Sequence, residues 1–144
     1  MKVFVDVNIL ISVLNKEYPL FSHSARVLSL NKKQGVELYT SPLCLSIAFF
    51  FSSKKSGELL AKKKISLLVE NIGLTTMDEG MVREALGNSK VHDFEDGMQY
   101  YSAIGTGCKV LVTENKEDFY FSEMEVLGCE EFIMKYFSKD LVKL

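Results

Sequence analysis

The sequence predicts an α/β protein whose mostly parallel sheet is covered by helices on both faces. Short runs of β-branched and aromatic residues alternate with segments whose apolar residues recur at helical spacing. This alternation is typical of parallel sheets. The chain has 144 residues, 47% of them hydrophobic and 25% charged, and it contains no internal repeat or linker. Together these features indicate a single domain spanning residues 1–144.

Each strand is predicted from a short apolar run bounded by polar residues or glycine. In chain order these runs are 3–5, 36–40, 73–77, 109–113 and 125–127. The run at 73–77 is the weakest of them, whereas 109–113 is the clearest in the second half of the chain. We therefore expect a sheet of four to five short strands.

Helices are predicted where apolar residues recur every three or four positions. In chain order these segments are 9–14, 22–30, 43–51, 59–72, 78–86, 93–104 and 130–137. Ser41 and Pro42 fit the N-cap and the first position of the third helix. That helix is so apolar that we expect burial on most sides, with Phe49–Phe51 in the core. The lysines of 59–72 are expected on its outer face.

The net charge is only −2, but the charged residues are unevenly distributed. Residues 53–64 hold five lysines against Glu58, and residues 114–131 hold seven acids against Lys116. Two solvated faces would explain these runs. The alternative is a track for a substrate on one side and a site for a cation or a partner on the other.

The cysteines and the apolar segments favour a cytoplasmic protein that does not insert into a membrane. Cys44, Cys108 and Cys129 are odd in number and far apart, so reduced, buried thiols are expected. Asp6 interrupts any signal-peptide core at the N-terminus. The longest apolar stretch, at 43–51, is too short to span a bilayer.

Polar residues follow two of the predicted strands, and acids begin the helix that leads to the second of them. Asp6 follows the first strand, 113–118 follows the strand at 109–113, and acids occupy positions 93, 95 and 96. The carboxyl ends of parallel strands form one edge, where sites gather. Mg²⁺ or Mn²⁺ suits such an all-oxygen site and activates water for attack on a phosphodiester. The simpler explanation is that Asp6 and Asp96 cap helices.

Other chemistries find less support in the sequence. No glycine-rich phosphate loop, dinucleotide fingerprint or Gly-x-Ser-x-Gly motif occurs. A receiver-type phosphoacceptor needs an Asp after a middle strand, and 41–53 has none. Only His23 and His92 could serve a hydrolase triad. His92 borders the acids, and a structural role is the simpler explanation for a single histidine.

Three segments together carry a more specific signal: VFVDVNIL (3–10), HDFEDGMQYYSA (92–103) and VTENKEDF (112–119). In order and spacing they resemble the PIN-domain family, and within it the bacterial members related to toxin ribonucleases of the virulence-associated protein C type. The resemblance implies a three-layer α/β/α sandwich with a short, mostly parallel sheet. It also implies Mg²⁺ or Mn²⁺ as cofactor, single-stranded RNA as substrate, a cognate antitoxin and homodimer formation.

The same resemblance assigns roles residue by residue. Catalytic roles fall to Asp6, Asp96, Asp118 and Glu95, and metal binding to Asp6, Asp96 and Asp118. The resemblance gives supporting or substrate-contacting roles to Asn8, Thr113 and Asn115. Independently of it, Lys54 and Lys55 are expected to contact the substrate because of their positive charge. The two lysines would guide the RNA backbone.

One departure from the family pattern concerns an acid that members usually carry on the helix after the second strand. That place falls at 46–48, where the chain has Ser, Ile and Ala.

The first hypothesis for the function is a metal-dependent endoribonuclease. Because the acid is missing, the second hypothesis is a catalytically weakened module that binds RNA or a protein partner. An unrelated α/β metabolic enzyme is a third. Phe49–Phe51, if not core, would form an apolar patch for a dimer or an antitoxin.

Overall fold

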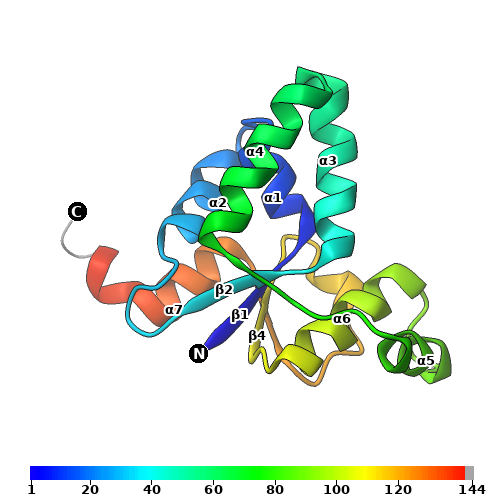
Figure 1. Ribbon diagram of the computed structural model, residues 1–144. Helices are drawn as coiled ribbons and strands as arrows, with labels where there is room; N and C mark the ends of the chain where they lie inside the picture. The colour runs from blue at the N-terminus through cyan, green and yellow to red at the C-terminus, as the bar shows by residue number, and fades with distance from the viewer. Residues whose placement is uncertain (142–144) are drawn as a thin grey trace.

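The computed structural model, which describes residues 1–141, has at its centre a sheet of five strands in which all neighbours run parallel (Figure 1). The strands are β1 (Lys2–Val5), β2 (Glu37–Thr40), β3 (Gly73–Leu74), β4 (Val110–Val112) and β5 (Glu125–Leu127). Their order across the sheet is β3-β2-β1-β4-β5. The predicted α/β class and the number of strands are thereby confirmed.

Helices lie on both faces of the sheet, as expected. They are α1 (Val7–Leu14), α2 (Leu20–Ser29), α3 (Pro42–Ser56), α4 (Glu58–Asn71), α5 (Glu79–Gly87), α6 (Phe94–Thr106) and α7 (Cys129–Leu141), with a 3₁₀ turn η1 (Lys116–Phe119). Helices α1, α2 and α7 lie on one side of the sheet and α6, backed by α5, on the other, while α3 and α4 form a hairpin that projects away from it (Figure 1).

The core forms around the two central strands. Val3, Phe4 and Val5 of β1 have no exposed surface, and the three residues of β4 are buried beside them. Helices α1 and α7 contribute Ile9 and Phe132, which are also fully buried. Because strands covered on both faces bury every side chain, β1 and β4 read as continuous apolar runs. Their register pairs Val5 with Val112, so both strands end at the same level.

Helix starts follow the expected capping chemistry. The hydroxyl of Ser41 accepts a hydrogen bond from the backbone N–H of Cys44, with Pro42 as the first helical residue of α3. Asp78 caps α5 in the same way by accepting from Met81 N. Gly57, at φ +85°, separates α3 from α4, a conformation that favours glycine.

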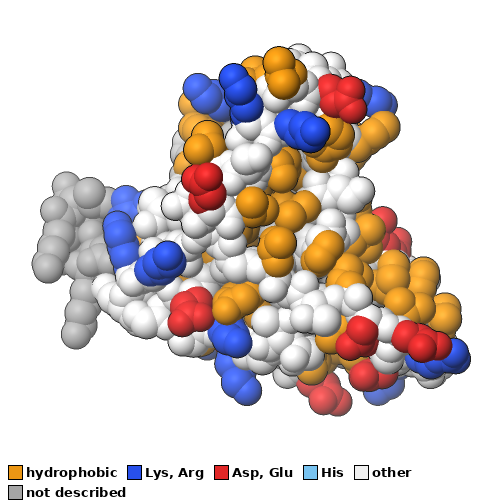
Figure 2. All heavy atoms as spheres, viewed as in Figure 1, with side chains coloured by type: hydrophobic (Ala, Val, Ile, Leu, Met, Phe, Trp, Pro, Cys, Tyr) orange, Lys and Arg blue, Asp and Glu red, His pale blue; other side chains and the backbone are white. Residues whose placement is uncertain are grey.

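The expected burial of Phe49–Phe51 is wrong for two of the three rings. Phe50 is 53% exposed and Phe51 45% exposed, because this part of α3 extends beyond the sheet (Figure 1) and packs against α4 and the end of α1. Helix α4 likewise exposes apolar side chains besides its lysines. Figure 2 shows apolar side chains interspersed with lysines over the hairpin. We call this exposed set, made of Phe50, Phe51, Leu59, Leu60 and Leu67, the α3–α4 apolar surface.

Two further features bear on the expectations from the sequence. Cys44, Cys108 and Cys129 are free and buried. Within residues 1–141, no helix combines the length and the apolar character needed to cross a bilayer.

Candidate active site

The strand order reverses between β1 and β4, and in open parallel sheets the carboxyl ends at such a point frame a binding crevice. Asp6 follows β1 directly, and its backbone N–H donates to the carbonyl of Val112 on β4 at 3.0 Å. Thr113 follows β4. The sheet therefore brings together two polar residues that are more than a hundred positions apart in the sequence.

Both carboxylate oxygens of Asp6 are held in place. The backbone N–H of Val7 donates to Oδ1 at 2.8 Å, and the hydroxyl of Thr113 donates to Oδ2 at 2.7 Å. The backbone N–H of Asn115 donates to the Thr113 oxygen at 3.1 Å, which orients the hydroxyl toward Asp6. Asp6 is 6% exposed and Thr113 is fully buried. The result is a buried carboxylate in a fixed orientation at the switch point.

The N-terminus of α6 and the turn η1 bring further acids to this edge. Burial, followed by the charges of Asp93, Asp118, Asp6 and Glu95, raises the pKa of Asp96 to about 7. Burial also raises the pKa of Asp6, and the charge of Asp118 adds to that effect. For Glu95, burial, Asp93 and Asp6 all raise the pKa. These acids therefore lie close enough for their charges to act on one another.

Helix capping explains only part of this arrangement. Asp6 does cap α1, through its bond from Val7 N. Asp96, in contrast, is not a cap. The residue that caps α6 is Asp93, whose carboxylate accepts from the backbone N–H of Asp96 at 3.2 Å. The half-buried carboxylate of Asp96 therefore has no capping role that would account for its position.

The two lysines do not lie beside the acids. Lys55 Nζ donates to the backbone carbonyl of Asn15, at the far end of α1 from Asp6. The eight residues of α1 separate these two points by roughly 12 Å. Lys54 Nζ lies 4.3 Å from the centroid of the Phe50 ring. Asn8 is half-buried in the first turn of α1, close to Asp6 in the chain.

Sequence reasoning missed one buried pair close to the site. The hydroxyl of Ser41 donates to Oε1 of Gln99, which is 2% exposed, and Nε2 of Gln99 has no partner in the described chain. This bond links the N-terminus of α3 to α6 one turn after Asp96. The three-residue spacing places Gln99 on the same face of α6 as Asp96, but no local pattern pairs it with Ser41.

Where the family pattern expects an acid on α3, the chain has an apolar residue. Ile47 is half-buried and lies about one turn beyond Cys44. The thiol of Cys44 has a pKa raised to about 12 by burial, with a smaller contribution from the charge of Asp6. This part of α3 therefore faces the site without contributing a carboxylate of its own.

The donors at this edge suit a hard divalent cation. Asp6, Asp96 and Asp118 offer only carboxylate oxygens, and none of them takes part in an ion pair among residues 1–138, whose side chains the structure describes. No three acidic, His or Cys side chains in this described part of the chain already converge at metal-ligand spacing. Binding would therefore bring the more exposed Asp96 and Asp118 side chains toward the fixed Asp6.

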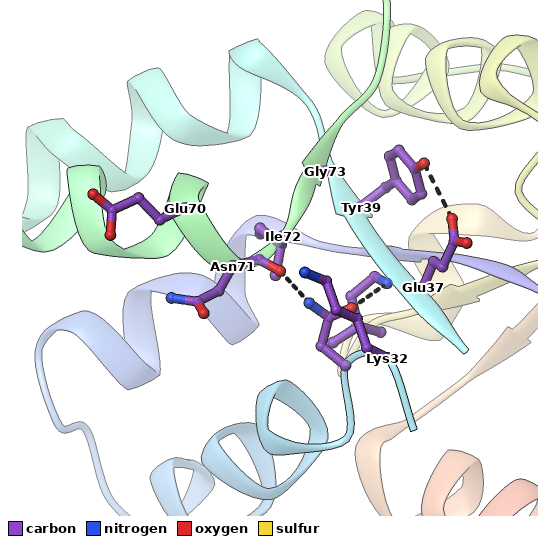
Figure 3. Close-up of a pocket in the computed structure, with 9 residues that line it drawn as sticks. Lys32, Glu37, Tyr39, Glu70, Asn71, Ile72 and Gly73 are labelled. Carbon is purple, nitrogen blue, oxygen red and sulfur yellow. Dashed lines mark hydrogen bonds between the residues drawn. The ribbon is translucent and has the colours of Figure 1, made fainter. Parts of the chain in front are cut away.

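A separate cavity of about 390 Å³ lies at the other edge of the sheet (Figure 3). Glu37 and Gly73, the first residues of β2 and β3, line it together with Asn71 at the end of α4. The hydroxyl of Tyr39 points toward Glu37 in this view and donates to it at 3.4 Å. None of the candidate catalytic acids lines this cavity.

Comparisons with known proteins agree on one family. The PIN domain family matches residues 2–117. Ribonuclease VapC1 of Aquifex aeolicus (strain VF5) is 28% identical over 138 residues, which cover 94% of this chain and 95% of the relative.

Among solved structures, VapBC-1 of nontypeable Haemophilus influenzae is similar with a TM-score of 0.70 and 17% identity, over 90% of this chain and 99% of that one. VapC20 of Mycobacterium tuberculosis, described as a sarcin-ricin loop cleaving toxin, gives 0.61 and 12%, over 76% and 86%. At these identities the structures show a shared fold.

Proposed function

This chain belongs to the PIN domain family, and we propose that it is an endoribonuclease that hydrolyses phosphodiester bonds of single-stranded RNA with the help of Mg²⁺ or Mn²⁺. The observation that carries the proposal is the group of acids at the β1–β4 switch point. Burial and then the charges of these acids raise the pKa of Asp96 to about 7. In the described chain, no lysine or arginine pairs with Asp6, Asp96 or Asp118. A bound cation would remove this repulsion.

Asp6, Asp96 and Asp118 are the residues that would hold the cation, with Glu95 as a further carboxylate beside them. Asp6 needs no reorganisation, because Val7 and Thr113 already hold its two oxygens. When bound, such a cation supplies Lewis-acid polarisation of a phosphate and makes nearby water more acidic.

The chain's own residues contribute orientation and negative charge. Thr113 fixes Asp6, and the backbone N–H of Asn115 fixes Thr113. In the metal-free chain, burial and the neighbouring acids raise the pKa of Asp96 to about 7, so a bound cation would replace a proton there and hold the carboxylate in its charged form. The Ser41–Gln99 hydrogen bond holds α6 against the start of α3 and so supports the position of Asp96. We assign Asn8 and Asn115 to supporting roles.

A cognate antitoxin is the proposed protein partner, which makes this chain the toxin of a toxin–antitoxin pair. The relative named Ribonuclease VapC1 and the VapBC-1 structure support this proposal. The α3–α4 apolar surface supports it as well, because exposed apolar patches mark interaction sites. Lysines 62 and 63 border that surface and favour an acidic, apolar segment. Homodimer formation is the second assembly that the family implies.

We propose that residues 1–144 form one PIN domain and that the protein is cytoplasmic. Three free, buried thiols suit the cytoplasm, because that compartment keeps cysteines reduced.

Ile47 motivates a second candidate function. Without the acid that the family usually carries on α3, a cation has fewer ligands, and catalysis is the activity most sensitive to that loss. The alternative is a PIN domain that binds RNA or a protein partner without cutting efficiently.

One experiment separates the two functions. Labelled single-stranded RNA is incubated with Mg²⁺ or Mn²⁺ and wild type, Asp6→Asn, Asp96→Asn or Glu70→Gln, an exposed acid at the opposite edge of the sheet. We expect cleavage by wild type and Glu70→Gln and its loss in both Asp variants. Equal cleavage by all four proteins rejects the nuclease assignment. RNA binding without cleavage by the wild type supports the second function.

A further inference from the structure

Two aromatic rings meet on the surface beside the acids. The ring centroids of His92 and Tyr120 are 5.3 Å apart, with an interplanar angle of 51°. His92 lies four residues before Asp96, and Tyr120 lies two residues after Asp118. The ring pair therefore joins the two segments that carry the outer acids of the candidate active site, and it lies at the rim of that site.

The Tyr120 ring is fixed although it is 54% exposed. Its hydroxyl donates to the backbone carbonyl of Lys90, and its ring meets that of Phe121 edge-on at 5.5 Å. Phe121 packs in turn against the buried Tyr100, with centroids 5.1 Å apart. A ring held on three sides loses little conformational entropy when a ligand covers its free face.

The loop that carries His92 is braced as well. The side-chain amide of Asn88 donates to the hydroxyl of Tyr101 on α6 at 3.0 Å, and its Oδ1 accepts from the backbone N–H of Lys90 at 3.0 Å. The backbone N–H of Val91 donates to the carbonyl of Asn88 at 3.0 Å. Both halves of the ring pair therefore rest on α6.

Resting on the proposed action on RNA, we propose that Tyr120 and His92 form a stacking platform for a base of the single-stranded RNA next to the bond that is cut. Single-stranded nucleic acids are bound through aromatic rings that stack on unpaired bases. The platform tolerates any base, because every base has a π-face. It positions the strand, while the acids carry the chemistry.

The charges around the platform favour a base over an anionic group. Asp93, Glu95, Glu117 and Asp118 lie within three residues of one ring or the other in the chain and repel phosphate. A neutral π-face avoids that repulsion. The backbone carbonyl of Lys90 accepts the hydrogen bond from the Tyr120 hydroxyl, which places Lys90 next to the platform. Because Lys90 is exposed, its ammonium group can contact the phosphate next to the stacked base. Among the side chains of residues 1–138, none forms an ion pair with Lys90.

The test measures binding without cleavage. Fluorescein-labelled single-stranded RNA is titrated in the presence of a chelator with the full chain as wild type, Tyr120→Ala, Tyr120→Phe and His92→Ala. The same titrations use a strand of equal length whose central nucleotides lack bases. We expect Tyr120→Ala to weaken binding of the complete strand about tenfold, and Tyr120→Phe to stay within about twofold because the ring remains. On the abasic strand the variants should bind alike.

The outcomes distinguish this proposal from the nuclease assignment. Equal binding of the complete strand by wild type and Tyr120→Ala overturns the platform and leaves the nuclease assignment standing, as does an equal loss on both strands. Loss of binding to a protein partner with unchanged RNA binding overturns it too. Tyr120-dependent binding in the chelator, with no cleavage by wild type when Mg²⁺ or Mn²⁺ is then added in excess, supports the platform and removes the nuclease assignment. Thermal unfolding of Tyr120→Ala checks that the fold is kept.

Discussion

The hydroxyl of Thr113 donates a 2.7 Å hydrogen bond to Oδ2 of Asp6, joining residues 107 positions apart in the chain. The parallel register that pairs Val5 with Val112 places the two residues side by side at the ends of β1 and β4. Burial raises the pKa of Asp6, and this hydrogen bond opposes that effect by stabilising the carboxylate. Thr113 therefore keeps a buried acid available as a ligand.

Removal of the hydroxyl should damage the site and the fold together. We expect Thr113→Val to lower the free energy of unfolding by about 1–3 kcal/mol, because a buried carboxylate loses its donor. Mn²⁺ binding should weaken about 10–100-fold, as is typical when a residue supporting a ligand is removed. Urea unfolding and calorimetric titration with Mn²⁺ measure the two effects. Thr113→Ser keeps the hydroxyl and should behave like wild type, and equal losses in both variants would contradict this role.

The pKa of Asp96 predicts that the metal-free protein becomes less stable as the pH rises. The pKa of Asp96 is about 7 in the folded state, against an ordinary value of 3.8 for an exposed aspartate, so the folded state binds more protons between these values. The free energy of unfolding must then fall as the pH rises through that window, and level off above it. The raised pKa values of Asp6 and Glu95 add to the same trend.

Thermal unfolding in a chelator, followed from about pH 5 to about pH 8, checks this prediction. The melting temperature should fall along the series for wild type and fall less for Asp96→Asn. Addition of Mn²⁺ at the alkaline end should raise it, because the cation replaces the lost proton. A melting temperature that rises with pH would show that the acids are not coupled as described.

Much of the fold was predictable because its signals are local. The runs at 3–5 and 109–113 are apolar since both faces of these strands are covered, and helical spacing marked the helices. The parallel-sheet rule also predicted that Asp6 and the turn after 109–113 meet at one edge.

The features that the sequence did not reveal depend on tertiary contacts. Sequence spacing does not reveal that α3 extends past the sheet, so the exposure of Phe50 and Phe51 was missed. It also does not reveal that Asp93 caps α6 and leaves Asp96 free. The buried Ser41–Gln99 hydrogen bond joins two helices across 58 positions, and no local sequence pattern predicts it.

Gly97 lets α6 pack closely behind the acids. A Cβ at this position would lie 2.6 Å from Cγ1 of Val91 and 3.2 Å from Cβ of Ala85, and neither short side chain can swing away. We therefore expect Gly97→Ala to destabilise the protein by about 1–3 kcal/mol despite the better helix propensity of alanine. Gly105→Ala on the same helix is the control, because its Cβ would meet only the flexible end of Met81. Urea unfolding compares the two variants, and equal stabilities would contradict the packing argument.

Restoring the missing acid should strengthen metal binding. Ile47→Glu places a carboxylate where the PIN family usually has one, on the stretch of α3 whose Cys44 thiol feels the charge of Asp6. We expect Mn²⁺ affinity and RNA cleavage to rise, because a hard cation gains a ligand. Ser46→Glu adds the same charge at the neighbouring, exposed position and should change neither. If both variants behave alike, the gain comes from overall charge and not from ligation.

Lys54 and Lys55 are neighbours in the chain, but their contacts predict different roles. Lys55 Nζ donates to the carbonyl of Asn15 at the C-terminus of α1. A cation at this place bonds a carbonyl that has no donor within the helix, and it interacts favourably with the helix dipole. Lys55→Met should therefore lower the free energy of unfolding by about 0.5–1 kcal/mol. Lys54 lies over the Phe50 ring at the protein surface, where its charge stays accessible to a phosphate.

Salt dependence of RNA binding separates the two lysines. If Lys54 contacts one phosphate, Lys54→Met should reduce the slope of log K against log salt by about 0.7 and leave stability nearly unchanged. Lys55→Met should leave the slope alone, because its ammonium is already committed to a backbone carbonyl. A reduced slope in Lys55→Met with unchanged stability would instead support the RNA-guiding role expected of Lys55 from the sequence. It would mean that the bond of Lys55 to Asn15 breaks when RNA binds.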